Sequence, residues 1–383
     1  MIVLPNLPRV ALVTNVLSHY RVPCFEALAA RMPGQIDFFL LSGEMPHRAY
    51  VLANGAASIS TRVLPGWSRS HPPFDDLHLN DPRPALRGYD LVILGGWAEP
   101  SYLLLWVLAQ LKRTRVAFWI ESTLCDLSRQ TWRESVKRLM LSRASGAIVP
   151  GQSAAAYCEW LGLSRERIFV APNAVDTSYF RKQAETLLPI REDIRRELGL
   201  DGVVILFVGR MVESLKGISL LLEAQRRIES QDSSARLALV GEGENRPGYE
   251  RMVQELRLRS VKFIDFQRHD SLSRYYASAD VFVLPSRSEP WGFVLNEAME
   301  FGLPLVVTQA VGASPDLVTE GENGFVVPTG DAEALANALK RLVTDSALRR
   351  QMGEVSKRRI VAFSPEHWAD GFVRAIGAMT HAD

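Results

Sequence analysis

Two glutamates lie on either side of a Pro-Trp-Gly-Phe stretch in the segment SRSEPWGFVLNEAMEFGLPLVVT, residues 286–308. If one helix carried both, eight steps of about 100° from Glu289 to Glu297 would separate them by roughly 80° around its axis. The two carboxylates would then not share a helix face. We therefore expect Glu289 in the loop after an apolar strand, and Glu297 in the first turns of a helix that begins near Phe293.

This arrangement predicts a site for a ligand that is rich in hydroxyl groups. Gly292 would let the backbone approach the ligand closely, and the free N–H groups of the helix start would donate to phosphate or sugar oxygens. Carboxylates accept hydrogen bonds from hydroxyl groups. Glu297 would hold a vicinal diol such as a ribose, and Glu289 the hydroxyls of a second sugar. A solvent-exposed, capped pair of glutamates is the alternative for an isolated pair at this spacing.

The stretch FVGRMVESLKG, residues 207–217, has the composition of a phosphate site. Gly209 allows a sharp turn after a strand, and Arg210 and Lys216 flank the loop that opens the following helix. The amino end of a helix attracts anions through its dipole and free N–H groups, and an arginine binds oxygens two at a time. The stretch is neither a Walker P-loop nor a Gly-x-Gly-x-x-Gly fingerprint, and two solvated surface cations are the alternative.

Short apolar runs alternate with helical patterns along the chain. Runs typical of strands lie at 9–14, 36–42, 89–96, 115–121 and 146–151, and again at 203–210, 236–243, 261–266, 280–286, 304–308 and 324–327. This alternation indicates βαβ units and parallel sheets. Right-handed crossovers place loops at the carboxyl ends of the strands, where such sheets bind their ligands.

The pattern predicts an α/β fold with two doubly wound, Rossmann-like domains that face each other across a cleft. The stretch 170–182, rich in Pro, Asn and Asp, is the predicted interdomain linker, and it separates domains 1–182 and 183–363. A final helix is predicted after Ser364, which would cap it ahead of a proline at the first helical position. We expect this segment, about 364–383, to join the first domain.

The composition fits two buried cores and excludes some classes of protein. The 383 residues are 47% hydrophobic, which argues against disorder, and the formal net charge of +1 argues against a general polyanion binder. Residues 1–182 carry 20 Lys and Arg against 14 Asp and Glu, a net of +6. The remainder carries 24 against 29, a net of −5. The first half is therefore expected to face an anionic surface or substrate, unless the imbalance is random.

The cysteines and the apolar runs indicate a cytoplasmic protein. Cys24, Cys125 and Cys158 form no Cys-x-x-Cys pair or Cys/His cluster, which argues against structural zinc and for a reducing compartment. The start of the chain has no basic region ahead of an apolar run, so we expect no signal peptide. No apolar run reaches the roughly 18 residues that span a bilayer, so contact with the inner face of a membrane would be peripheral.

Four segments together resemble the nucleotide-sugar half of family 4 glycosyltransferases, which are retaining enzymes of the GT-B fold. They are VGRMVESLKG, LVGEGENRPGYERM, the run from VKFIDF through LPLVVT, and ENGFVVPTGDAEALANAL, in that order. The resemblance covers the second half almost continuously. It is looser in the first half, where residues 144–176 resemble the family's approach to its linker. It implies an acceptor-binding first domain and a second domain that binds the nucleotide sugar.

The resemblance also implies a role for each candidate residue. Arg210 and Lys216 would neutralise the donor diphosphate as it leaves, in place of a metal held by an Asp-x-Asp motif, which the chain lacks. Glu297 would bind the donor ribose and Glu289 the transferred sugar, and the base would sit near residues 264–268. No cofactor and no metal are expected. The full expected donor site is Gly209, Arg210, Lys216, Phe266, Glu289, Pro290, Trp291, Gly292, Phe293 and Glu297.

The first domain departs from the family pattern at one position. Many relatives have an active-site histidine after the strand that here is AFWIEST, where this chain has Glu121 and Ser122. Glu121 would contact the donor sugar or the acceptor, and a helix-capping Glu-Ser pair is the alternative. In the loop TNVLSHYRVP, where an acceptor would enter, His19 and Tyr20 are the candidate acceptor-binding residues.

These residues predict a metal-independent retaining transfer of a sugar to a hydroxyl acceptor. The departing phosphate would take the acceptor's proton in a front-face mechanism, because no residue stands out as a covalent nucleophile. The donor is expected to be a uridine-diphosphate sugar, with guanosine-diphosphate mannose next. Three alternatives stay open: a glycosidase, which would not explain the neighbouring cations, a nucleotide-sugar epimerase, and a non-catalytic nucleotide-sugar binding protein.

The acceptor is expected to be a hydroxyl of a glycan, of a lipid-linked molecule or of a small molecule, with a role in polysaccharide biosynthesis favoured. The stretch TWRESVKRLMLSRAS, residues 131–145, combines Arg133, Lys137 and Arg138 with Trp132 and further apolar residues. It is expected either to rest on an anionic membrane or to form a buried interdomain helix with a basic outer face.

Overall fold

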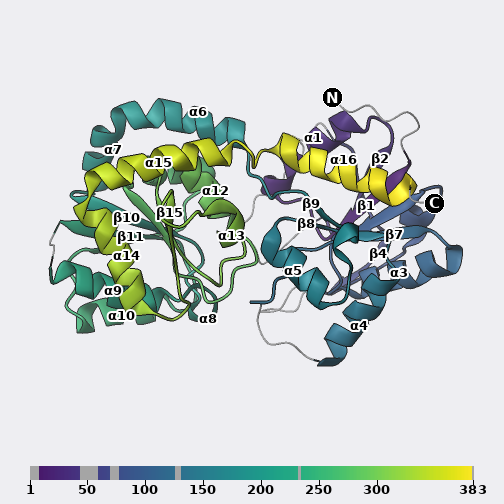
Figure 1. Cartoon of the computed structure of the whole chain (residues 1–383), viewed down its shortest axis with the longest axis horizontal. Helices are drawn as coiled ribbons and strands as arrows, with labels where there is room; N and C mark the ends of the chain where they lie inside the picture. Colours follow the sequence, from purple (N-terminus) through teal and green to yellow (C-terminus); the bar gives the residue numbers. More distant parts are fainter. Residues whose placement is uncertain (1–7, 44–58, 70–76, 126–130, 232–233, 382–383) are drawn as a thin grey trace. The chain divides into compact units, whose positions relative to one another are not determined.

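The computed structural model describes residues 8–43, 59–69, 77–125, 131–231 and 234–381. The chain forms two compact units (Figure 1). The first draws on residues within 1–124, 128–175 and 364–383, and the second on residues within 176–363 together with the short piece at 125. The division falls inside the predicted linker, but α6 (Thr177–Leu187) is helical and belongs to the second unit. Asp176 caps α6 by accepting from the Tyr179 N–H at 3.0 Å.

Among the described residues of the first unit, seven parallel strands form one sheet in the order β3-β2-β1-β6-β7-β8-β9. Their bounds are β1 Val10–Thr14, β2 Ile36–Leu40, β3 Thr61–Val63, β6 Leu91–Leu94, β7 Arg115–Trp119, β8 Gly146–Val149 and β9 Ile168–Val170. A separate antiparallel ribbon joins β4 (Gly66–Arg69) and β5 (Leu77–Asn80), and the short α2 (Arg83–Leu86) follows it.

Alternation along the strands of this sheet explains its two helical layers. Side chains of successive strand residues point to opposite faces. In β1, Val10 and Leu12 join the core beneath α1 (Val22–Arg31) and α16 (Pro365–His381). Ala11 and Val13 join the opposite core. The helices over that second face are α3 (Pro100–Lys112), α4 (Thr131–Ser142) and α5 (Gln152–Trp160).

The C-terminal helix is part of the first unit, although it follows the whole second unit in sequence. Figure 1 shows α16, in yellow, beside α1, in purple. An ion pair of 2.5 Å from Arg31 Nε to Asp370 Oδ1 joins the two helices. Trp368 is fully buried against Phe25 of α1 and Trp119 of β7. The chain must therefore cross back between the units after Phe363.

The described strands of the second unit form a parallel sheet in the order β12-β11-β10-β13-β14-β15. The strands are β10 Val203–Val208, β11 Ala235–Val240, β12 Val261–Ile264, β13 Val281–Leu284, β14 Leu305–Thr308 and β15 Gly324–Val327. The helices are α7 Arg191–Leu198, α8 Glu213–Lys216, α9 Ile218–Glu229, α10 Arg246–Glu255, α11 His269–Ser278, α12 Phe293–Glu300, α13 Ser314–Leu317, α14 Ala332–Thr344 and α15 Ser346–Ile360. The strand order changes direction between β10 and β13, which marks the switch point where ligands of doubly wound sheets bind.

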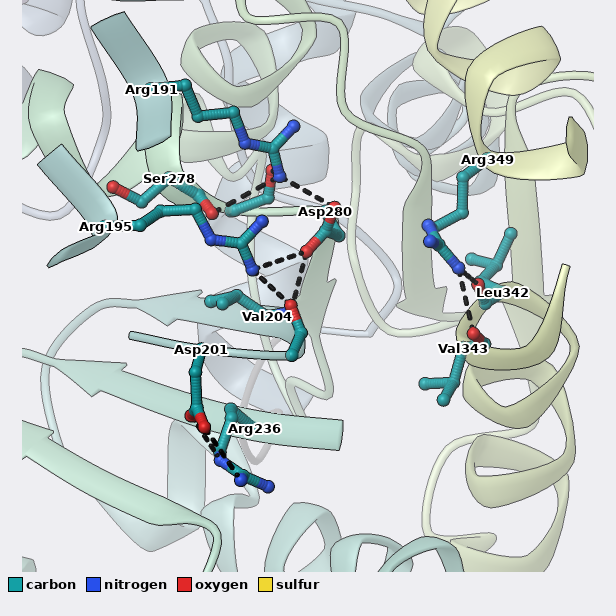
Figure 2. Close-up of polar contacts among 12 residues, drawn as sticks. Arg191, Arg195, Asp201, Val204, Arg236, Ser278, Asp280, Leu342, Val343 and Arg349 are labelled. Carbon is teal, nitrogen blue, oxygen red and sulfur yellow. Dashed lines mark hydrogen bonds and ion pairs between the residues drawn. The ribbon is translucent and has the colours of Figure 1, made fainter. Parts of the chain in front are cut away.

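The amino edge of this sheet is fixed by Asp280, just before β13 (Figure 2). Its carboxylate accepts from the Val204 N–H at 2.8 Å, from Arg191 Nη2 at 2.7 Å and from Arg195 Nη2 at 3.3 Å. Arg349 binds the last carbonyl groups of α14, at 2.9 Å to Val343, and so neutralises the negative end of that helix. The Asp280 contacts hold α7, β10 and the start of β13 together at the amino edge of the sheet, and the Arg349 contact joins α15 to the end of α14.

Candidate functional site

Two loops meet at the carboxyl edge of the second unit's sheet, beside its switch point. The loop after β10 ends in α8, and the carbonyl of Leu215 accepts from the N–H groups of Arg287 at 2.8 Å and Ser288 at 3.1 Å in the loop after β13. Gly217, with φ +60°, follows α8, and a Cβ at this position would lie 2.7 Å from the Pro285 carbonyl oxygen. Glycine is therefore required for the two loops to approach this closely.

Lys216 and Glu289 form an ion pair across these two loops. Their side chains are 16% and 15% exposed, so the pair is largely enclosed but still reachable from solvent. Gly209 lies against the lysine, since a Cβ there would come within 3.6 Å of Lys216 Cε. The structure thus brings together three of the residues that the sequence singled out, from two loops that are far apart in the chain.

The loop that carries Glu289 is held by its own backbone. The Glu289 N–H donates to the Ala310 carbonyl at 3.2 Å, and the Glu289 carbonyl accepts from the Gly312 N–H at 2.7 Å. Gly292 has φ +97° and immediately precedes α12, which begins at Phe293 as predicted. The Trp291 side chain is buried, and its indole N–H donates to Asn296 Oδ1 at 3.0 Å.

The side chain of Glu297 is buried, whereas the sequence predicted that it would be accessible to a ligand. It is on α12, as predicted, but its side chain has no exposed surface, and its Oε2 accepts from the Tyr276 hydroxyl at 2.6 Å. The cause is the packing of α12, which α6 and α15 cover and which buries Leu295 through Glu300. The carboxylate has no exposed surface in this conformation, so ribose binding by Glu297 remains a prediction.

The remaining donor-site candidates are exposed or half-buried. Arg210 follows Gly209 and makes no ion pair with any residue of the described chain. Pro290 is exposed next to Glu289, and Phe293 is half-buried at the start of α12. Phe266, after β12, is 48% exposed at the same edge of the sheet. Three loops, those after β10, β12 and β13, therefore present candidate residues at one edge of the second unit.

Glu300, one turn beyond Glu297, makes the stability of this unit depend on pH. It is 6% exposed, its Oε2 is 3.6 Å from Arg181 Nε, and its Oε1 has no hydrogen-bond partner among the described residues. Burial raises the pKa of Glu300 to about 7, against the opposing effect of Arg181. The folded state binds this proton more tightly than the unfolded chain does. The stability gained in this way is fully present below pH 4.5, the ordinary pKa of the group, and is lost as the pH rises to about 7 and above.

Replacing Glu300 by glutamine should therefore raise the melting temperature above pH 7. The glutamine stays neutral at every pH, and the expected gain at pH 8 is on the order of 1–3 kcal/mol. The difference between Glu300→Gln and the unmodified chain should disappear near pH 4.5. Thermal denaturation between pH 4.5 and 8.5 checks this, with Glu354→Gln, an exposed glutamate paired with Lys357, as the control. Equal melting temperatures at all pH values would contradict the assignment.

The first-unit candidates lie at the carboxyl edge of the other sheet. His19 and Tyr20 follow β1, with ring centroids 3.9 Å apart, and both are partly buried. Glu121 follows β7 and pairs with Arg21, which sequence analysis did not single out. Arg21 could have been identified from the sequence by its place beside His19 and Tyr20, in the loop already predicted to bind the acceptor.

The residues that the structure describes contain no group of three or more His, Cys, Asp or Glu side chains that could hold a metal ion. They also contain no helix of the length and apolar character needed to cross a membrane.

Two doubly wound units in one chain define the GT-B class, and solved structures confirm this predicted fold class. HepE of Anabaena, crystallised with UDP and glucose, matches with a TM-score of 0.71 and 17% identity over 97% of this chain and 99% of that chain. A glycosyltransferase from Rickettsia africae ESF-5 matches with a TM-score of 0.75 and 15% identity over 99% of this chain and 100% of that one. At these identities the likeness concerns the fold alone.

A family model matches most of the second unit. Residues 190–359 match "Glycosyl transferases group 1", which agrees with the glycosyltransferase resemblance of the second half of the sequence. The lipopolysaccharide core biosynthesis glycosyltransferase LpsE of Rhizobium meliloti is 33% identical over 46% of this chain and 51% of its own length. A D-inositol 3-phosphate glycosyltransferase of Corynebacterium aurimucosum is 29% identical over 65% and 60%. The chain thus spans about half the length of the curated relatives it matches.

Proposed function

We propose that this protein is a metal-independent, retaining glycosyltransferase that takes its sugar from a nucleotide-diphosphate donor. The observation that carries the proposal is the contact of Lys216 with Glu289 at the switch point of the second unit. A diphosphate needs a cation and a sugar needs hydroxyl acceptors, and this pair places both side by side. A glycosidase would need carboxylates as acid and base and has no use for the lysine.

The mechanism assigns a separate task to each charged group. Negative charge develops on the leaving diphosphate, and Lys216 together with the exposed Arg210 would stabilise it without a metal ion. Lys216 would exchange its bond with Glu289 for one with phosphate. Glu289, released from the lysine, would then accept hydrogen bonds from the hydroxyls of the transferred sugar. The departing phosphate would take the acceptor's proton, so that transfer occurs on one face with retention.

The donor is proposed to be a UDP-sugar, with GDP-mannose as the second candidate. The test is to incubate the full chain with UDP-glucose, UDP-N-acetylglucosamine and GDP-mannose, with and without glycan acceptors and a chelator. We expect nucleotide release that the chelator does not slow, and a product that keeps the donor's anomeric configuration. An inverted product or loss of activity with chelator would contradict the proposal. An altered nucleotide sugar without acceptor would indicate an epimerase, and binding without turnover a non-catalytic protein.

A lipid-linked or polysaccharide acceptor at the inner face of a membrane is supported by the outer surface of α4. Trp132, Val136 and Leu139 recur at helical spacing and are 63%, 37% and 47% exposed. Exposed Arg133 and Arg138 flank them. The opposite face of α4 is anchored, since its buried Glu134 accepts from Tyr157 of α5 at 2.6 Å. An exposed stripe of apolar and basic residues is typical of a helix that lies on an anionic bilayer.

Vesicle co-sedimentation tests this membrane contact. The full chain should sediment with phosphatidylglycerol vesicles at low salt, less with phosphatidylcholine, and less as salt is added. Trp132→Ser with Leu139→Ser should lower the bound fraction several-fold. Ile190→Ser, which alters an equally exposed apolar side chain in the second unit, is the control. Absence of binding at low salt, or equal binding by the α4 variant, would remove the membrane proposal.

A further inference from the structure

The short helix α8, which ends in Lys216, is held by the side chain of its first residue, Glu213. Glu213 Oε2 accepts from the Ser219 N–H at 3.1 Å and from the Tyr249 hydroxyl at 2.9 Å. Its Oε1 accepts from the Ser219 hydroxyl at 2.6 Å and from Arg287 Nη2 at 3.1 Å. The Glu213 carboxylate therefore joins α8 to α9, to α10 and to the loop after β13.

The backbone of the same segment is fixed as well. The Glu213 N–H donates to Asn245 Oδ1 at 2.8 Å, and the Asn245 N–H donates to the Met211 carbonyl at 3.1 Å. The Met211 N–H donates to the Glu242 carbonyl at 2.8 Å. These bonds join the loop that carries Arg210 to the loop after β11. Glu213 is thus bound through both its backbone and its side chain.

The side chain of Glu213 is charged at neutral pH. Burial acts to raise the pKa of Glu213, but the hydrogen bonds from Ser219, Tyr249 and Arg287 together outweigh it and lower the pKa below its usual value. Hydrogen bonds to an ionised carboxylate are stronger than those between neutral groups. The hold of Glu213 on its three neighbouring elements is therefore present under the conditions in which sugar transfer would be measured.

Global stability alone explains this arrangement poorly. The side chains of Glu213 and Arg287 are 31% and 39% exposed, and exposed ion pairs contribute only about 0–1 kcal/mol. A helix of four residues does not form by itself, because its nucleation is unfavourable. The main effect of the Glu213 contacts is therefore local. They hold α8 together and determine where its last residue, Lys216, lies.

We infer that Glu213 is a positioning residue that holds α8 so that the Lys216 ammonium group meets a phosphate of the donor. Glu213 acts through Lys216 and not by contact with the donor. This inference rests on the proposed function and adds a residue to it. Glu213, its partners and Lys216 all belong to the second unit, so the inference concerns that unit alone.

Binding of UDP and of uridine to the full chain separates positioning from collapse of the site. Glu213→Ala should weaken UDP binding about tenfold, because the contact of Lys216 with phosphate is partly lost. The affinity for uridine, which has no phosphate, should not change. Calorimetry measures UDP binding and ligand-observed NMR measures uridine binding. GDP and guanosine take their place if the unmodified chain prefers GDP.

Tyr249→Phe tests the same inference without changing any charge, and it also serves if Glu213→Ala does not fold. The substitution removes one donor to the carboxylate, so UDP affinity should fall about two- to threefold while uridine affinity stays the same. The control is Asp193→Asn, which alters an exposed ion pair of 2.9 Å with Arg196 in the same unit and should have no effect.

A double-mutant cycle shows whether Glu213 acts through Lys216. In a chain that carries Lys216→Ala, Glu213→Ala should cause little further loss of UDP affinity, because the lysine that it positions is absent. Losses that add in the double variant would overturn the positioning role, as would equal losses of UDP and uridine affinity.

Unchanged UDP affinity in Glu213→Ala would also overturn the inference, even if the melting temperature fell, because Glu213 would then serve stability only. Failure of the unmodified chain to bind any nucleoside diphosphate is a different result. It would contradict the proposed function, and the inference with it.

Discussion

Replacing Arg210 by alanine is expected to lower sugar transfer about a hundred- to a thousandfold while the protein stays folded. Loss of one preorganised donor to a developing negative charge typically has an effect of this size. Arg210 is exposed and makes no ion pair within the described residues, so its removal breaks no structural contact there. The loss should therefore appear in kcat rather than in the melting temperature. Initial rates with saturating donor, together with thermal denaturation, measure both quantities.

The control for Arg210→Ala is Arg227→Ala, which removes an exposed arginine from α9 in the same unit. This variant should keep full activity, because Arg227 is not on a loop of the carboxyl edge. A turnover of Arg210→Ala within a few-fold of the unmodified chain would refute the role of Arg210 in stabilising the leaving group.

The second large effect is expected from Glu289→Gln. This substitution should lower the rate of sugar transfer but should not weaken the binding of the nucleotide. Transfer should fall on the order of a hundredfold, because the hydroxyls of the transferred sugar lose a charged acceptor. Binding of UDP or GDP alone should stay equal or tighten a few-fold. Without the carboxylate, Lys216 is no longer held by Glu289 and its charge is available to phosphate. Steady-state kinetics and calorimetric titration of the nucleotide test the two halves separately.

A parallel loss of transfer and of nucleotide affinity in Glu289→Gln would point to collapse of the loop. The backbone bonds of Glu289 to Ala310 and Gly312 do not involve its side chain and should survive the substitution. A Lys216→Ala variant provides the comparison, since it should weaken nucleotide binding and transfer together. If both variants behaved alike, the proposed division of tasks between the lysine and the glutamate would be wrong.

Much of the fold could be predicted because local patterns determine it. Strands buried on both faces are apolar throughout, and runs such as 203–208 are visible without any partner. The start of α12 at Phe293 was predictable because Gly292 permits the positive φ that precedes it. Glu289 and Lys216 could be assigned to one site because both follow strands that flank the switch point of the sheet.

The features that the sequence did not predict depend mainly on contacts between elements that are distant in the chain. Burial of Glu297 results from Tyr276 on α11 and from the helices that cover α12, and periodicity within α12 does not report them. The contacts of Arg21 with Glu121 and Asn173 join three loops whose neighbours are set by strand order, and strand order is not visible in one sequence. The first part of α6 was predicted as linker because residues 170–182 are rich in Pro, Asn and Asp, whereas Asp176 in that stretch caps the start of a helix.

The most direct test of the central claim is a crystal structure of the full chain with UDP bound. The account predicts the diphosphate at the loops after β10 and β13, with a phosphate oxygen roughly 3 Å from Lys216 Nζ and the lysine released from Glu289. A diphosphate bound elsewhere, or one bound while the Lys216–Glu289 pair stays intact, would contradict it.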